Sequence, residues 1–260
     1  MRGFHWTWLL GLAALGLGAL GLAWIDVLPG GWTLRGWVIP HAQREERLRL
    51  QHREQRLAEF QAQPPVPRGA VLFAGASHIE YFPLDAAFGP GLTCNRGIGG
   101  EVCAELLERL PGTLQELRPG AIVLSLAAND FLQRDADAAN IRSQVEKVFD
   151  RIAAQAPGVP AVVIGILPAS ESTPERIAEL ARINAGIASL CQERGVQFLG
   201  TDGAPFTTEG GRLAPEVAAD RYHLNEAGYR ALTRRWMQRF PEWQERLKVQ
   251  PGWAAPSESL

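Results

Sequence analysis

Short apolar runs alternate with segments of helical periodicity along most of this chain. Such alternation is typical of an α/β fold, in which crossover helices join the strands of a parallel sheet. We therefore expect one five-stranded parallel sheet, with strands at Val71–Ala74, Leu92–Cys94, Ala121–Leu126, Ala161–Ile166 and Val196–Leu199.

Two helices between these strands are indicated by apolar residues that recur on one helical face. The first face comprises Ile141, Val145, Val148, Phe149 and Ile152, and the second Ile177, Leu180, Ala181, Ile187, Leu190 and Cys191. A final helix should begin with Asn225 as its N-cap and bury Leu232, Trp236 and Phe240. Pro111 should divide the helix after Gly100 into two pieces, because its ring does not fit a helix interior.

An uncharged stretch of 20 residues runs from Trp6 to Ile25. As a helix it is about 30 Å long, the thickness of the bilayer hydrocarbon. We predict a transmembrane signal anchor over residues 1–28, with a cleaved signal peptide as the alternative. Arginines flank both sides, so the signal-like layout alone favours a position of the following domain outside the cytoplasm. Tryptophans typical of the membrane interface bracket the stretch at positions Trp6, Trp8, Trp24, Trp32 and Trp37.

The rest of the chain divides into three parts. Residues 29–67 should hold an exposed juxtamembrane helix over His41–Gln63, rich in Arg, Glu and Gln, and a stiff proline-rich linker. We expect the main folded domain at residues 68–245 and a loose tail at residues 246–260.

Composition narrows the choice of function. The 260 residues are 46% hydrophobic, enough for one sizeable core, and the net charge of −2 offers no basic field for nucleic acid. Three cysteines without metal-ligand spacing predict buried free thiols, although Cys94 and Cys103 could pair in an oxidising compartment. We expect no cofactor and no metal, and the sequence leaves the oligomeric state open.

Three candidate residues follow predicted strands. Ser77, Gly97 and Asn129 each lie one to five residues beyond a strand, and in an open α/β sheet the ligand crevice lies beyond the carboxyl ends of the strands. They should therefore converge on one edge of the sheet. The small pair Gly75–Ala76 would let the chain turn and present the Ser77 hydroxyl at a helix start, where free N–H groups stabilise an anion.

Asp220 and His223 lie three residues apart in a turn before the final helix. At this spacing the carboxylate can reach the Nδ1–H of the histidine and leave Nε2 to accept the serine proton. His78 adjoins Ser77, but adjacent side chains on a helix point apart, so we favour His223 as the base.

Each of these residues also has an ordinary structural interpretation. Ser77 could be only a helix cap, Gly97 a loop glycine with positive φ, and Asn129 a turn or cap residue. Asp220 and His223 could be surface loop residues. Only the combination indicates acyl transfer.

In order and context, the four segments resemble the SGNH hydrolase superfamily, the GDSL-like esterases and lipases. They resemble particularly the bacterial branch of this superfamily that is similar to platelet-activating-factor acetylhydrolase. The resemblance covers roughly Arg68 to Phe240 and rests on Phe73–Ser77, Asn95–Gly100, Ser125–Asp130 and Asp220–Asn225.

The resemblance implies a flavodoxin-like, three-layer α/β/α fold. It also implies that Ser77 is the nucleophile, His223 the general base and Asp220 the residue that orients it. The oxyanion hole would consist of the Ser77 and Gly97 backbone N–H groups and the Asn129 side chain. Two residues depart from the family pattern: Ala76 replaces an aspartate, and Ala127 replaces a glycine.

The leading hypothesis is a membrane-tethered serine esterase that cleaves a short acyl ester, such as acetyl, on a small molecule, an envelope glycan or a lipid. An O-acyltransferase acting on glycans would use the same acyl-enzyme. A catalytically silent binding module is the third hypothesis, motivated by Ala76 and Ala127.

Overall fold

The computed structural model describes residues 41–253. The predicted transmembrane segment, residues 1–28, lies outside them. Within residues 41–253, no helix combines the length and the apolar character needed to cross a membrane. The chain divides into two compact units between Gln55 and Arg56.

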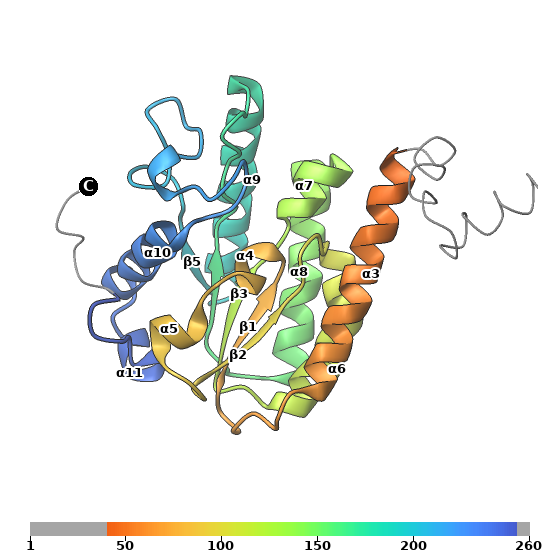
Figure 1. Ribbon diagram of the computed structural model, residues 1–260, viewed down its shortest axis with the longest axis vertical. Helices are drawn as coiled ribbons and strands as arrows, with labels where there is room; N and C mark the ends of the chain where they lie inside the picture. The colour runs from red at the N-terminus through yellow and green to blue at the C-terminus, as the bar shows by residue number, and fades with distance from the viewer. Residues whose placement is uncertain (1–40, 254–260) are drawn as a thin grey trace, which may run out of the picture. The chain divides into compact units, whose positions relative to one another are not determined.

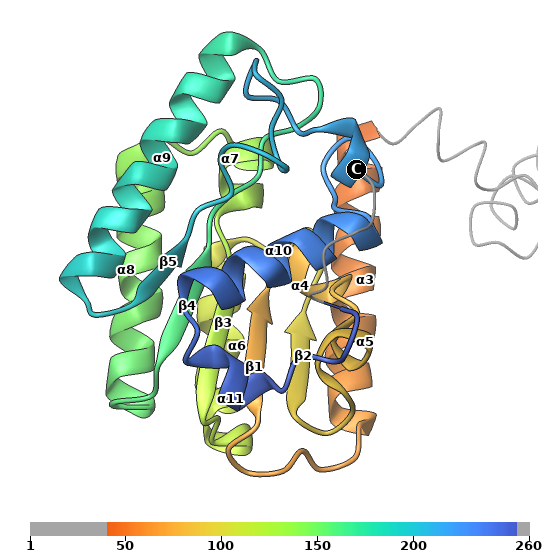
Figure 2. The same ribbon diagram turned by 90° about the vertical axis from the view of Figure 1, so that its left-hand side faces the viewer.

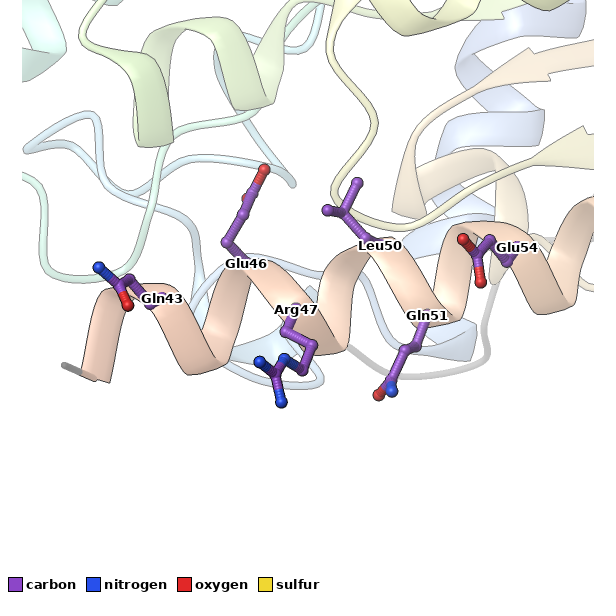
Figure 3. A pocket seen from close by; sticks show the side chains of 6 residues that line it. All are labelled: Gln43, Glu46, Arg47, Leu50, Gln51 and Glu54. Atoms are coloured by element: carbon purple, nitrogen blue, oxygen red, sulfur yellow. The ribbon is translucent and has the colours of Figure 1, made fainter. Parts of the chain in front are cut away.

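The described part of the first unit is the beginning of helix α3 (His41–Ala62), which confirms the predicted helix. Leu48 and Leu50 are exposed on it. A surface pocket lies along this one helix, and Figure 3 shows that Leu50 is its single apolar lining residue beside Gln43, Glu46, Arg47, Gln51 and Glu54. This pocket is lined by residues of one helix and contains none of the candidate site residues.

The second unit is built on a five-stranded parallel sheet in the order β2-β1-β3-β4-β5 (Figure 1). All five predicted strands are confirmed, and the order is that of flavodoxin-like folds. The strands are β1 (Val71–Gly75), β2 (Thr93–Gly97), β3 (Ala121–Ser125), β4 (Ala161–Ile164) and β5 (Gln197–Leu199).

Alternate side chains of the strands enter two separate cores, because successive residues of a strand point to opposite faces. Phe73 enters one core and Leu72 the other. The Phe73 core includes residues of α5 (Leu84–Phe88), α10 (Glu226–Arg239) and α11 (Trp243–Leu247); Figure 2 shows the last two across that face. The Leu72 core includes residues of α6 (Cys103–Leu117), α8 (Ala138–Gln155) and α9 (Pro174–Glu193).

Three short helices complete the described elements, and all of them lie in loops: α4 (Ser77–Glu80), α7 (Ala128–Arg134) and the 3-10 helix η1 (Pro215–Val217). The predicted apolar face of α8 is buried in full. The face of α9 is mostly as predicted, but Ala181 is exposed and Ile183 takes a buried place. Asn225 is the N-cap of α10, as expected, and accepts the Gly228 N–H at 2.9 Å.

The prediction that Pro111 splits its helix is wrong, because α6 continues through it from Cys103 to Leu117. Its apolar face has buried leucines on both sides of the proline, Leu110 before it and Leu114 after it. Packing of this continuous face against the sheet outweighs the local loss of one backbone hydrogen bond.

The predicted loose tail from residue 246 is also wrong as far as the chain is described. Leu247 is buried, and so is Trp253, whose Nε1–H donates to Thr233 Oγ1 at 3.1 Å. Burial of an indole with its N–H satisfied ties this segment to α10.

Candidate active site

Ser77 lies at the carboxyl end of β1, where the chain turns directly into α4 (Figure 1). Gly75 makes the turn possible: its φ is 137°, and a Cβ there would overlap the Ser125 carbonyl of β3. The Ala76 N–H donates to that same carbonyl at 3.0 Å. As the first residue of α4, Ser77 has no earlier carbonyl within the helix for its N–H.

The structure brings Ser77, His223 and Asp220 into one line. Ser77 Oγ lies 2.9 Å from His223 Nε2, and His223 Nδ1 lies 2.8 Å from Asp220 Oδ2. An ionised carboxylate can only accept, so Nδ1 carries the proton and Nε2 is left to accept from the hydroxyl.

Asp220 is held by its own turn as well as by the imidazole. Its Oδ1 accepts the N–H groups of Tyr222 at 2.8 Å and His223 at 2.9 Å. Burial, which raises the pKa of Asp220, is outweighed by the hydrogen bonds from the His223 ring and these two N–H groups, and the pKa falls to about 2. The carboxylate therefore stays charged throughout the neutral range.

The turn is anchored from behind by Asn225. Its backbone N–H donates to Val217 O at 2.9 Å, and its amide donates to Glu216 O at 3.0 Å and Ala218 O at 3.2 Å. The same side chain caps α10, so the position of the Asp220–His223 turn is coupled to the docking of that helix.

His78 lies beside His223, and the centroids of the two imidazole rings are 5.6 Å apart. It takes no part in the hydrogen bond between Ser77 Oγ and His223 Nε2. Burial and repulsion from His223 lower the pKa of His78 to about 4, so it is neutral at pH 7. Its carbonyl accepts the Tyr229 hydroxyl at 3.0 Å. His78 is therefore a packed neighbour of His223, and His223 is the histidine that contacts the Ser77 hydroxyl.

Asn129 lies in the first turn of α7, directly beyond β3, and is buried. Its amide donates to the Glu101 carbonyl at 2.9 Å, and its Oδ1 accepts from Gln133 Nε2 at 2.9 Å. Strands β1 and β3 are neighbours where the order of the sheet reverses, which is the usual position of a ligand site in such folds. Ser77 and Asn129 follow these two strands.

The role of Gly97 as an oxyanion donor stays a prediction. Its N–H donates to Asn95 Oδ1 at 2.9 Å and is thus already engaged. Its glycine identity has a packing reason instead, because a Cβ would overlap the backbone of Glu80 in α4. Positive φ, the other interpretation, does not apply at this residue.

Sequence reasoning missed a buried ion pair next to Asn129. Arg109 donates to both carboxylate oxygens of Glu101 at 2.6 Å, with side chains only 8% and 1% exposed, and also to Arg96 O at 2.8 Å. The pair fixes the residue whose carbonyl orients the Asn129 amide. In the sequence, the only indication of this ion pair is that Glu101 and Arg109 are eight residues apart, and this spacing is too unspecific to predict a contact.

Both departures from the family pattern have visible consequences. Ala76 is the N-cap of α4 and offers no side-chain acceptor to its first N–H groups. Ala127 has a φ of 70°, a conformation that costs a residue with a Cβ about 1 kcal/mol or more. Neither residue lies in the hydrogen-bonded line from Ser77 to Asp220.

The three cysteines are free and buried, as expected, and burial raises the pKa of each thiol. Among residues 41–253, no group of three His, Cys, Asp or Glu side chains could hold a metal ion.

The GDSL-like Lipase/Acylhydrolase family matches residues 80–231. Platelet-activating factor acetylhydrolase IB subunit alpha2 of Bos taurus and of Homo sapiens is 29% identical over 165 residues, which cover 61% of this chain and 70% of the relative.

Solved structures agree with this match. A protein from Streptococcus pneumonia, described provisionally as a platelet activating factor, is 25% identical, with a TM-score of 0.67 over 76% of this chain and 97% of that chain. A GDSL-like lipase from Bacteroides thetaiotaomicron shares the fold, at 19% identity and a TM-score of 0.59 over 72% and 97% of the two chains. The chain therefore belongs to the GDSL-like lipase/acylhydrolase family and is a serine hydrolase of the SGNH superfamily.

Proposed function

We propose that this protein is an esterase that hydrolyses short acyl esters through Ser77, His223 and Asp220. The observation that carries the proposal is the line of hydrogen bonds from Ser77 Oγ through the imidazole to Asp220. The names of the curated relatives specify acetyl hydrolysis, which supports a short acyl group.

In the first half-reaction, Ser77 Oγ attacks the ester carbonyl while His223 Nε2 takes the hydroxyl proton. The Ser77 N–H and the second amide N–H of Asn129 then stabilise the oxyanion. Collapse of the tetrahedral intermediate breaks the bond to the alcohol, which leaves with the proton from His223. The acyl group stays on Ser77 Oγ.

In the second half-reaction, His223 removes a proton from water, and the resulting hydroxide attacks the acyl carbonyl. The acid leaves, and the proton returns to Ser77 Oγ. His223 is 23% exposed and Asp220 is 56% exposed in their side chains, so water has access to the base.

The decisive test compares the full-length protein with Ser77→Ala on p-nitrophenyl esters of increasing chain length. We expect activity on the acetyl ester to be lost in Ser77→Ala, while circular dichroism and the melting temperature stay close to the wild type. A folded Ser77→Ala protein with most of its activity would contradict the nucleophile assignment.

A fluorophosphonate probe and product analysis separate this function from the two alternatives. An active esterase is labelled at Ser77, whereas a silent binding module is not. Transfer of the acyl group to an added glycan in preference to water would identify an acyltransferase. The same chain-length series defines the acyl pocket.

The tether and the side of the membrane remain proposals from the sequence. We infer from the apolar stretch Trp6–Ile25 that the protein is membrane-bound with its catalytic domain outside the cytoplasm. Carbonate-washed membranes should retain it, and a periplasmic reporter fused after Leu260 should be active. A soluble product that begins near Trp24 would show a cleaved signal instead.

A further inference from the structure

Glu80 joins the serine helix to the loop that follows β2. It is the last residue of the four-residue helix α4, which Ser77 begins. The Glu80 carboxylate accepts the Gly99 N–H and pairs with Arg56 Nε at 3.5 Å. Glu80 therefore lies within one helical turn of Ser77, so a shift of Glu80 would also shift the turn that carries the proposed nucleophile.

Arg56 comes from the last turns of α3 and holds the same loop. Its Nε and Nη2 donate to Gly97 O at 3.3 and 3.2 Å. The guanidinium lies over the buried Phe60 ring, 4.9 Å from its centroid, and its side chain is only 15% exposed. Arg56 is thus a packed side chain with a fixed direction.

The loop itself spans the two halves of the candidate site. At one end, the Gly97 carbonyl accepts a hydrogen bond from Arg56, and the Gly99 N–H donates one to the Glu80 carboxylate. At the other end, the Glu101 carbonyl accepts the Asn129 amide at 2.9 Å. A displacement of this loop would change the position of the Asn129 amide relative to Ser77.

We propose that Arg56 and Glu80 are positioning residues, which fix loop 97–101 on α4 and thereby set the Asn129 amide opposite Ser77. The proposal rests on the proposed function. Arg56 lies upstream of the family match at residues 80–231 and of the predicted domain at 68–245. The C-terminal turns of α3 are in this view part of the catalytic machinery.

The first test is the kinetics of Arg56→Ala in the full-length chain. Misplacement by about 1 Å can cost on the order of 100-fold in rate, so we expect kcat to fall roughly 10- to 100-fold. KM should stay nearly constant, because the oxyanion exists only after attack. Fluorophosphonate labelling should slow in parallel.

Arg142 provides the matched control. Like Arg56, it bridges a backbone carbonyl and a carboxylate, Gly186 O at 3.0 Å and Glu193 at 2.7 Å, but between α8 and α9. Arg142→Ala should leave kcat at the wild-type value. An equal fall of kcat in both variants would overturn the proposal.

Milder variants keep the test decisive if Arg56→Ala does not fold. Arg56→Lys retains the charge but cannot hold both partners with a planar fork, so its kcat should be intermediate. Glu80→Gln should lower kcat in the same way, and the double variant should be less impaired than two independent losses predict. Wild-type kcat in folded Arg56→Lys and Glu80→Gln would overturn the proposal.

Including Ser77→Ala in the series distinguishes the two possible failures. If Ser77→Ala remains active, the proposed function fails. If Ser77→Ala is inactive while the Arg56 and Glu80 variants have unchanged kcat, only the positioning role fails.

Discussion

The Asn129 amide donates to the Glu101 carbonyl at 2.9 Å, and Arg109 holds Glu101 by its carboxylate. The N–H that donates to Glu101 fixes the planar amide of Asn129 and thereby sets the direction of the second N–H. In the proposed mechanism this N–H is an oxyanion donor, and removing such a donor typically costs on the order of 100- to 1000-fold in turnover.

Asn129→Ala should therefore lower kcat by about 100- to 1000-fold with little change in KM. Steady-state kinetics on a p-nitrophenyl ester measures both. Gln133→Ala, which removes only the bond to Asn129 Oδ1, should have a smaller effect. A change confined to KM would assign Asn129 to substrate binding.

Asp220→Asn should lower kcat by about 10⁴, because an amide N–H facing Nδ1 favours the wrong tautomer of His223. The asparagine Oδ1 can still accept the N–H groups of Tyr222 and His223, so the turn should persist. Asp135→Asn is the control, since Asp135 is an exposed partner of Arg176, and it should keep full activity. Activity of Asp220→Asn near the wild type would contradict the role of this carboxylate.

Ala127→Gly should raise the free energy of unfolding by about 1 kcal/mol, because glycine adopts a φ of 70° without strain. Urea titration provides the measurement. The matched change Ala185→Gly, at an exposed position inside α9, should lower stability by a similar amount. Equal destabilisation by both changes would show that Ala127 is not strained.

Stability should fall as the pH drops from 6.5 to 4. The pKa of His78 is lowered from 6.5 to about 4 by burial and by His223, so in this window the unfolded chain binds the proton more readily. The slope attributable to this residue is at most about 1.4 kcal/mol per pH unit.

The difference between wild type and His78→Gln, measured by urea titration at several pH values, isolates this contribution. Asp130, whose pKa is raised by burial, changes the stability with pH in the opposite direction. It does so equally in both proteins, so its contribution cancels in the difference. Parallel stability curves for the two proteins between pH 4 and pH 7 would refute the assignment to His78.

The three thiols should not react with Ellman's reagent in the native protein, since all are buried and burial raises the pKa of Cys191 to about 12. Denaturation should expose all three. Fast reaction of any thiol under native conditions would contradict this.

The central strands β1, β3 and β4 were predictable from the sequence because each is a short apolar run buried on both faces, and such runs stand out. The contact between Asp220 and His223 was also predictable, because the two residues are only three positions apart. The break predicted at Pro111 is wrong because local propensity takes no account of the packing of Leu110 and Leu114 around it.

Long-range contacts account for what the sequence could not predict at the site. That Gly97 packs on α4, with its N–H engaged by Asn95, depends on how two loops meet. Arg56 reaches Gly97 across 41 positions and lies in a helix whose charges suggest only a solvated face. Trp253 is buried through a partner 20 positions earlier.

The anchoring of the Asp220–His223 turn by Asn225 has a consequence for biosynthesis. Ser77 emerges from the ribosome 146 residues before His223, and the Asn225 cap that supports the turn forms only together with α10. Because domains fold as the chain is made, Ser77 lacks its hydrogen-bond partner His223 until nearly the whole domain has been synthesised. Under the proposed function, we therefore expect ester cleavage to begin only when translation of this domain is nearly complete.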